Sequence, residues 1–148
     1  DSYGHDVEAG WLLCEVARVL EDRQLMDRAN RLALDVTDAC LAEGLSDKGY
    51  MMYEKKGGRT TGHASWWGQI ETMIACVNAW QISGNDVYLQ SADTVWTFVK
   101  DCMIDREYGE WYSDCFDGEP KKDTPKVSMW RCPYHTVRLG VEIHNRLK

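Results

Sequence analysis

The chain has 148 residues, of which 44% are hydrophobic and seven are tryptophan, so it is long enough to bury one core. Its formal net charge is −7, whereas nucleic acids and anionic membranes are bound by basic surfaces. No apolar stretch approaches the roughly 20 residues that cross a bilayer, and the first residues lack the regions of a signal peptide. The composition therefore favours a cytoplasmic protein that binds a neutral small molecule and neither nucleic acid nor membrane.

Two kinds of helix alternate along the chain. Residues 7–20 are apolar on nearly every side, which predicts a helix covered by protein all round. Residues 25–40 place apolar side chains three or four positions apart with charges opposite, which predicts an outer helix with a solvent face. The same two patterns return at residues 66–82 and 87–103, and a last helix is expected over residues 134–147.

Two irregular segments, residues 43–64 and 105–129, separate these helices. Each holds turn signals rich in glycine and aspartate, among them Gly57–Gly58 in the first and Asp117–Gly118 in the second, together with a short strand-like piece. The strand-like pieces are Tyr50–Tyr53 in the first segment and Glu110–Tyr112 in the second. We therefore expect short β-hairpin-like insertions between the helix pairs.

The two helix pairs are copies of one another, because Glu8 and Glu71 occupy equal positions 63 residues apart, as do Ala29 and Ala92. Such a repeat predicts stacked helical hairpins, and the alternation of buried and amphipathic helices favours a closed double ring. The long segments that precede the inner helices then gather at one rim. Five helices cannot close this ring and the chain begins at Asp1, so we expect the C-terminal part of a longer protein. Apolar surface left open would favour a homo-oligomer.

The six cysteines are expected to be free thiols. Nothing in the sequence signals secretion, which is the context of disulfide frameworks in small domains. Four of them fall inside the apolar helical patterns, where a free cysteine behaves as a small hydrophobic residue. These four are Cys14, Cys40, Cys76 and Cys102.

His5 and His135 stand where irregular chain turns into predicted inner helices. Glu8 follows His5 by three positions, so the two side chains share a helix face and the carboxylate could orient the imidazole. A base with an orienting partner is what proton transfer requires. A single pair at this spacing is nevertheless more often structural, and only the second histidine at the same rim favours a catalytic role.

A metal site is not expected. Cys132 and His135 have the spacing of half a zinc site, but zinc needs further ligands at comparable spacing. His63 and His144 supply no matching pattern.

Four aromatic residues are expected at the rim with the histidines. A single tryptophan is more often core, whereas several beside one another form a surface that stacks on a sugar ring. The candidates for sugar binding are Trp66, Trp67, Trp130 and Tyr134.

Four motifs resemble, in order, those of the cellobiose 2-epimerases within the N-acylglucosamine 2-epimerase superfamily. They span essentially the whole chain and are Ser2–Leu13, Trp66–Glu71, Gly109–Trp111 and Trp130–Arg138. The Tyr-Gly-His-Asp and Cys-Pro-Tyr-His sequences within them resemble the cellobiose and mannobiose epimerases more than the N-acylglucosamine branch.

The resemblance implies that residues 1–148 are the C-terminal portion of a single (α/α)6-barrel catalytic domain. It implies inversion at C2 of the reducing-end sugar of a β-1,4-linked disaccharide, cellobiose or mannobiose, without metal or organic cofactor. His5 and His135 would be the acid/base pair on opposite faces of the open-chain sugar, with a cis-enediolate between the two steps. Glu8 would assist His5, and Trp130 with one of the paired tryptophans would hold the sugar.

The family pattern also needs an arginine and a further histidine from the N-terminal half, so we expect this chain alone to have negligible activity. Two alternatives of the same fold use enediolate chemistry on another sugar: an N-acylglucosamine 2-epimerase and an aldose–ketose isomerase. An alternative of another class is a non-catalytic α/α-toroid module that binds a glycan or a protein, with the histidines incidental.

Overall fold

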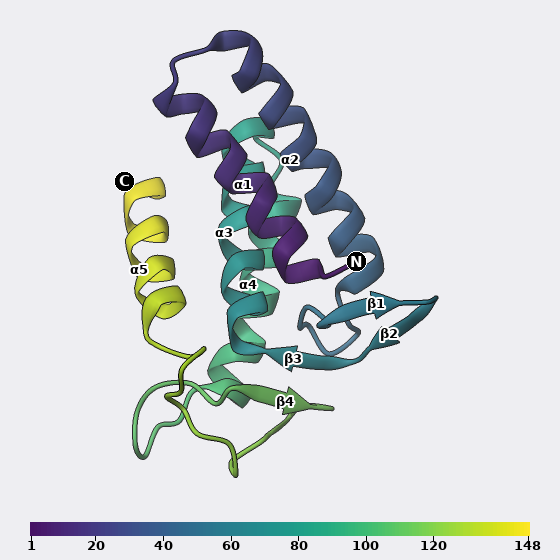
Figure 1. Cartoon of the computed structure of the whole chain (residues 1–148), viewed down its shortest axis with the longest axis vertical. Coiled ribbons are helices and arrows are strands. Elements are labelled where there is room, and N and C mark those ends of the chain that lie inside the picture. Colours follow the sequence, from purple (N-terminus) through teal and green to yellow (C-terminus); the bar gives the residue numbers. More distant parts are fainter.

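The computed structural model describes all 148 residues and is built mainly from helices (Figure 1). The helices are α1 (Tyr3–Val19), α2 (Arg23–Gly44), α3 (Trp66–Ser83), α4 (Val87–Phe98), the π-helical turn η1 (Val99–Met103) and α5 (Tyr134–Arg146). The strands are β1 (Glu54–Lys56), β2 (Arg59–Thr61), β3 (His63–Ser65), β4 (Asp114–Phe116) and β5 (Glu119–Pro120). None of the helices combines the length and the apolar character needed to span a membrane.

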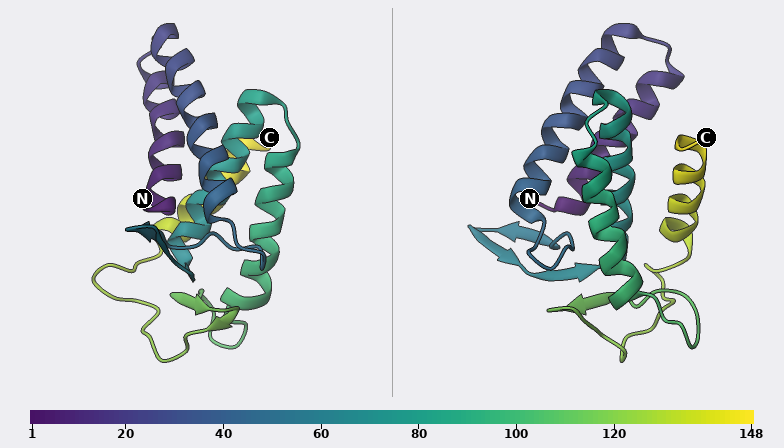
Figure 2. Two further views of the ribbon diagram at one scale, coloured as in Figure 1. Left: turned by 90° about the vertical axis from the view of Figure 1, so that its right-hand side faces the viewer. Right: turned by 180° about the vertical axis from the view of Figure 1, so that it is seen from behind.

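The helices alternate in direction, as the repeat predicts. α1, α3 and α5 start at the same end of the molecule, whereas α2 and α4 return in the opposite direction (Figures 1 and 2). α3 is central, because it packs against α1, α2, α4 and α5. All its residues from Gly68 to Ala79 are buried, which explains why this stretch is apolar on every side. Gly84 ends the helix in the left-handed conformation, with φ 70°.

α1 is less covered than its sequence predicts. One side packs against α2 and α3, but Leu13, Val16 and Val19 are 45%, 53% and 82% exposed. Leu25 and Leu32 of α2 extend this apolar face along the groove between the two helices. The prediction that both sides of α1 are buried is therefore wrong for the chain as it stands.

Both predicted strand-like pieces are wrong in position, since each forms only a single bridge, at Met51 and at Trp111. A buried side chain explains the first case. Gln69 accepts a hydrogen bond from the Met51 N–H through Oε1 and donates one to the Met51 carbonyl through Nε2, both at 2.8 Å. The amide thereby satisfies the backbone groups that a neighbouring strand would otherwise pair.

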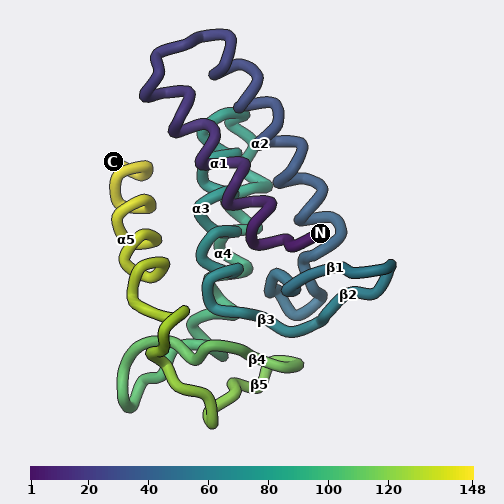
Figure 3. Tube along the Cα trace, viewed as in Figure 1, coloured from purple at the N-terminus to yellow at the C-terminus, as the bar shows by residue number.

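The strands lie at the end of the molecule where α1, α3 and α5 begin (Figure 3). β1 and β2 form an antiparallel hairpin around Gly57 and Gly58, both with positive φ, where the sequence predicts a turn. β3, β4 and β5 form a second antiparallel sheet, with the predicted turn at Asp117 and Gly118 between the last two strands. β3 continues directly into α3, so the sheets support the rim of inner-helix starts.

Buried charges hold the long segment that precedes α5. Lys126 bonds the Asp105 carboxylate and donates to the Gly109 carbonyl at 2.8 Å, and the bond from Lys126 holds the pKa of Asp105 well below its usual range. Arg131 donates to the carbonyls of Lys126 at 2.8 Å and Trp111 at 2.5 Å. Burial lowers the pKa of the Arg131 guanidinium. The segment that leads into α5 is therefore fixed by cations that bond backbone carbonyls.

All six cysteines are free thiols, as predicted. Cys76 and Cys115 are fully buried, and burial raises the pKa of both thiols to about 12. Cys132 alone is exposed.

Candidate active site

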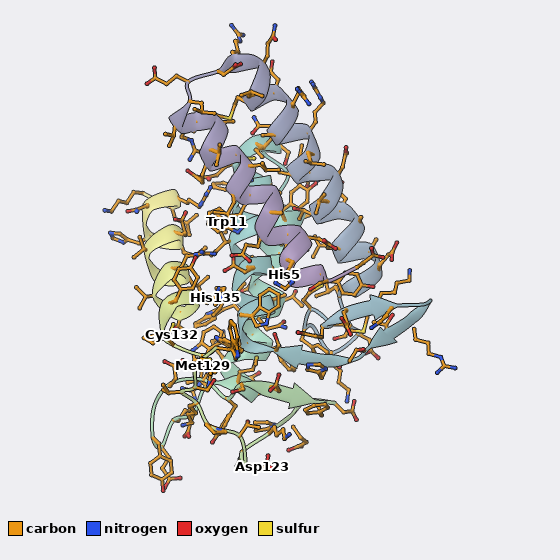
Figure 4. All side chains as sticks on the ribbon, in the orientation of Figure 1. His5, Trp11, Asp123, Met129, Cys132 and His135 are labelled. Atoms are coloured by element: carbon orange, nitrogen blue, oxygen red, sulfur yellow. The ribbon has the colours of Figure 1, made fainter.

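The first turns of α1, α3 and α5 bring His5, Trp67 and His135 together, and we call these three residues the histidine cluster. The Trp67 ring centroid lies 4.5 Å from that of His5 and 6.0 Å from that of His135. Figure 4 shows both histidines on the side of the molecule where α1 faces α5. The two predicted histidines therefore lie at one rim, and a single indole ring lies beside both.

Glu8 does not orient His5. The Nδ1 atom of His5 lies 2.8 Å from the Ser2 hydroxyl oxygen, and Glu8 instead accepts a hydrogen bond from Arg138 Nη1 at 2.6 Å. A guanidinium is a charged donor and binds a carboxylate more strongly than a neutral imidazole does. The predicted bond between Glu8 and His5 is therefore wrong, because a partner on another helix takes the carboxylate.

The carboxylate that orients a histidine is Glu71 of α3. Its Oε1 atom lies 2.7 Å from His135 Nδ1, and the side chain is fully buried. An ionised carboxylate only accepts hydrogen bonds, so the His135 proton is assigned to Nδ1 and Nε2 keeps its lone pair. This tautomer leaves Nε2 free to accept a proton from a bound molecule.

The buried carboxylate of Glu71 accepts hydrogen bonds from both neighbouring inner helices, and the donor from α5 is positively charged. Arg138 of α5 donates to Oε1 at 3.0 Å, and Trp11 of α1 donates to Oε2 through its indole N–H at 2.9 Å. A carboxylate is tolerated in a core only when it is paired and hydrogen-bonded. Because Arg138 also binds Glu8, one guanidinium joins a carboxylate of α1 to a carboxylate of α3.

The same groups could suggest a metal site. Glu8, Glu71 and His135 each place one ligand atom within 4.8 Å of the others. However, Arg138 Nη1 bonds both carboxylates and brings a positive charge to the position that a cation would occupy. Repulsion between the Arg138 guanidinium and a metal cation held by the same carboxylates disfavours a metal ion at this position.

The other predicted aromatic residues surround the histidine cluster at different depths. The Trp66 ring lies edge-on to that of His135, with centroids 6.2 Å apart, and the Arg131 guanidinium lies over the Trp66 ring, 4.8 Å from its centroid. Tyr134 is 51% exposed, with its ring 4.7 Å from that of His135. Trp130 is 86% exposed, and no ring contact joins it to the cluster. The structure thus brings Trp66, Trp67 and Tyr134 to the histidines but leaves Trp130 on the surface.

No role in the site was predicted from the sequence for Glu71, Arg138 or Trp11. A signal for Glu71 was present, since it is a charge within a stretch predicted to be buried on all sides, and such a charge needs a partner. Arg138 follows His135 by three positions and Trp11 follows Glu8 by three, so each shares a helix face with a candidate residue. What the sequence did not contain was the pairing between the helices.

Gly4 sets the position of Trp67. A Cβ atom at Gly4 would lie 2.6 and 2.7 Å from two ring carbons of Trp67. We expect Gly4→Ala to displace the indole and to lower the free energy of unfolding by about 1–3 kcal/mol, as overpacking does. Urea unfolding measures the loss, and near-ultraviolet circular dichroism reports the displaced ring.

The matched control for this change is Gly140→Ala on α5, where an added Cβ atom meets nothing within 4 Å. We expect that variant to be slightly more stable than the wild type, because alanine favours a helix. Equal stabilities of Gly4→Ala and Gly140→Ala would show that Gly4 is not needed for the placement of Trp67.

Residues 2–138 match the model of the family described as N-acylglucosamine 2-epimerase. The chain belongs to the N-acylglucosamine 2-epimerase family. Within this family it is 40% identical over 147 residues to a cellobiose 2-epimerase of Bacteroides fragilis, which covers 96% of this chain and 37% of the relative. It is 37% identical to a cellobiose 2-epimerase of Ruminococcus albus, over 98% of this chain and 38% of the relative. This family member thus spans less than two fifths of the length of these relatives.

Solved structures of sugar epimerases match the fold of this chain. A sugar epimerase from a ruminal bacterium matches with a TM-score of 0.93 at 35% identity, over 98% of this chain and 38% of that chain. The structure of cellobiose 2-epimerase from Bacillus thermoamylovorans matches with a TM-score of 0.87 at 33% identity, over 99% of this chain and 37% of that chain. A D-mannose isomerase at 22% identity, with a TM-score of 0.84, shares the fold. The predicted fold class, part of an epimerase-type (α/α)6 barrel, is confirmed.

Proposed function

We propose that the protein to which this chain belongs inverts C2 of the reducing-end sugar of a β-1,4-linked disaccharide, cellobiose or mannobiose. The contact of Trp67 with both His5 and His135 carries this proposal, because a sugar bound beside that ring would have a titratable group within reach from two helices. The relatives named cellobiose 2-epimerases support the choice of substrate.

The proposed reaction begins with the open-chain aldose. One histidine removes the proton from C2, the electron pair forms the C1–C2 double bond of a cis-enediolate, and the negative charge moves to the former carbonyl oxygen. The other histidine then donates a proton to the opposite face of C2, and the carbonyl forms again. One proton leaves and one returns, so the reaction balances without an oxidant or reductant.

The hydrogen bonds of the site suit His135 to this role. Glu71 holds the Nδ1 proton of His135, so Nε2 is the atom that takes the substrate proton, and the carboxylate stabilises the imidazolium that results. Arg138 in turn keeps Glu71 and Glu8 in place. We propose that Glu8 acts on the site through Arg138, whereas His5 is oriented by Ser2.

Sugar binding is proposed to fall to the aromatic residues around the histidine cluster. Trp67, Trp66 and Tyr134 offer ring faces and edges beside His135, and such surfaces pack against the C–H groups of a pyranose. Trp130 is exposed, four residues before the start of α5, and is proposed to cover the sugar.

Product analysis tests the function. We expect the full-length protein to convert cellobiose into the disaccharide with mannose at its reducing end, and this chain alone to have negligible turnover. Chromatography against both authentic epimers measures the product. Efficient epimerisation by the isolated chain would refute the requirement for the remainder of the barrel.

A second candidate is an aldose–ketose isomerase, because the chain is also 26% identical over 99 residues to a D-mannose isomerase of Marinomonas mediterranea. A ketose product would favour this alternative. Turnover of N-acylglucosamine but not of the disaccharides would favour an N-acylglucosamine 2-epimerase. Sugar binding without any exchange of the C2 proton would favour a non-catalytic module.

A further inference from the structure

Arg146 ties the inner helices together at the end of α5 that lies away from the histidine cluster. Its side chain is only 6% exposed. The guanidinium bonds Glu15 of α1 and donates to Asn78 of α3 at 3.1 Å, to Gln81 of α3 at 2.9 Å and to Glu142 of α5 at 3.0 Å. One side chain therefore fixes the spacing of the three helices whose other ends carry the candidate site.

Arg146 is also linked to the site through Trp11. Its guanidinium carbon lies 5.7 Å from the Trp11 ring centroid, and that of Arg138 lies 5.4 Å from the same centroid. Residues 138 and 146 are about two turns apart on one face of α5, so the buried indole lies against both cations. Trp11 donates to Glu71, and Glu71 holds His135. A continuous series of contacts thus leads from Arg146 to the histidine.

We propose that Arg146 is a positioning residue for proton transfer at His135. It holds Trp11, and through Trp11 the Glu71 carboxylate, in the geometry that fixes the His135 tautomer. Arginine suits this task because its planar group presents five donors in a fixed arrangement, whereas lysine offers a compact ammonium. The inference rests on the proposed function, since it concerns the histidine to which that function assigns proton transfer.

The test uses Arg146→Gln and Arg146→Lys in the full-length protein, with cellobiose as substrate. We expect kcat to fall about 10- to 100-fold in Arg146→Gln, as small displacements of catalytic groups produce, with KM changed by less than about twofold. The primary isotope effect on kcat from C2-deuterated substrate should rise, because proton transfer becomes slower relative to the other steps. Arg146→Lys should recover part of the loss.

Two further measurements separate positioning from simple stabilisation. Arg18→Gln removes the other cation that pairs with Glu15, on a side chain that is 56% exposed, and should leave kcat and the isotope effect unchanged. Nitrogen-15 NMR of the His135 ring reports its tautomer without turnover. We expect an Nδ1-protonated ring in the wild type and a mixture of tautomers in Arg146→Gln.

The proposal would be overturned if the Arg146 variants kept the kcat, the isotope effect and the His135 tautomer of the wild type. This holds even if their melting temperatures fall, because Arg146 would then have a structural role only. If Arg146→Gln does not fold, the same three measurements on Arg146→Lys decide between a positioning role and a purely structural one. A wild-type protein that leaves both cellobiose and mannobiose unchanged would refute the proposed function instead, and the NMR result would still show whether Arg146 positions His135.

Discussion

Replacing His135 by asparagine is expected to lower kcat for epimerisation by about 10²- to 10⁴-fold, the contribution of a positioned acid or base. Asparagine keeps a donor that can face Glu71, so the buried carboxylate stays bonded and the fold survives. Initial rates of epimer formation by the full-length protein measure the loss.

His144→Asn is the matched control for this substitution. His144 lies on the same helix, two to three turns further on, and is exposed. We expect its removal to leave kcat unchanged. If His135→Asn kept a rate within tenfold of the wild type while His144→Asn behaved as expected, His135 would not be an acid or base in the reaction.

Replacing Arg138 by methionine is expected to lower the free energy of unfolding by about 3–5 kcal/mol, the cost of leaving one member of a buried ion pair without its partner. The carboxylates left behind are those of Glu71, which is 0% exposed, and Glu8, which is 19% exposed. Urea denaturation of this chain measures the loss. In the full-length protein the same variant should also lose most of its turnover, because Glu71 no longer has a fixed position beside His135.

Two further variants test whether the loss of stability in Arg138→Met comes from the buried Glu71 carboxylate. Lys55→Met removes the surface partner of Glu43, and an exposed pair of this kind contributes at most about 1 kcal/mol. Adding Glu71→Gln to Arg138→Met should restore part of the stability, since a neutral amide is less costly to bury than an unpaired charge, but should not restore turnover. A loss for Arg138→Met as small as that for Lys55→Met would contradict the assigned pairing.

The helices and the rim were predictable because their signals are local or periodic. The pattern of α2 places Ala29, Ala33 and Cys40 on one buried face, and the equal positions of Glu8 and Glu71 in the repeat indicated that α1 and α3 start at the same level. Turn glycines were found for the same reason, since a positive φ depends on the residue itself.

The pairings across helices were not predictable from spacing. The three-residue separation of His5 and Glu8 shows that both can share a face, but it does not exclude a stronger partner from elsewhere. Arg138 is such a partner and lies 130 residues beyond Glu8 in the chain. The misplaced strand at Met51 has a similar cause, because a side chain of α3 takes its backbone hydrogen bonds. Contacts of this kind become visible only when α1, α3 and α5 are packed together.

Two separate histidines are proposed to act on opposite faces of C2, and the reaction of the full-length protein with cellobiose in deuterated water tests this most directly. The histidine that donates the new proton exchanges with solvent before it acts. The epimer formed should therefore carry one deuterium at C2, measured by proton NMR and mass spectrometry, and His5→Asn or His135→Asn should stop its formation. Formation of the epimer with the original hydrogen still at C2 would contradict the two-histidine mechanism.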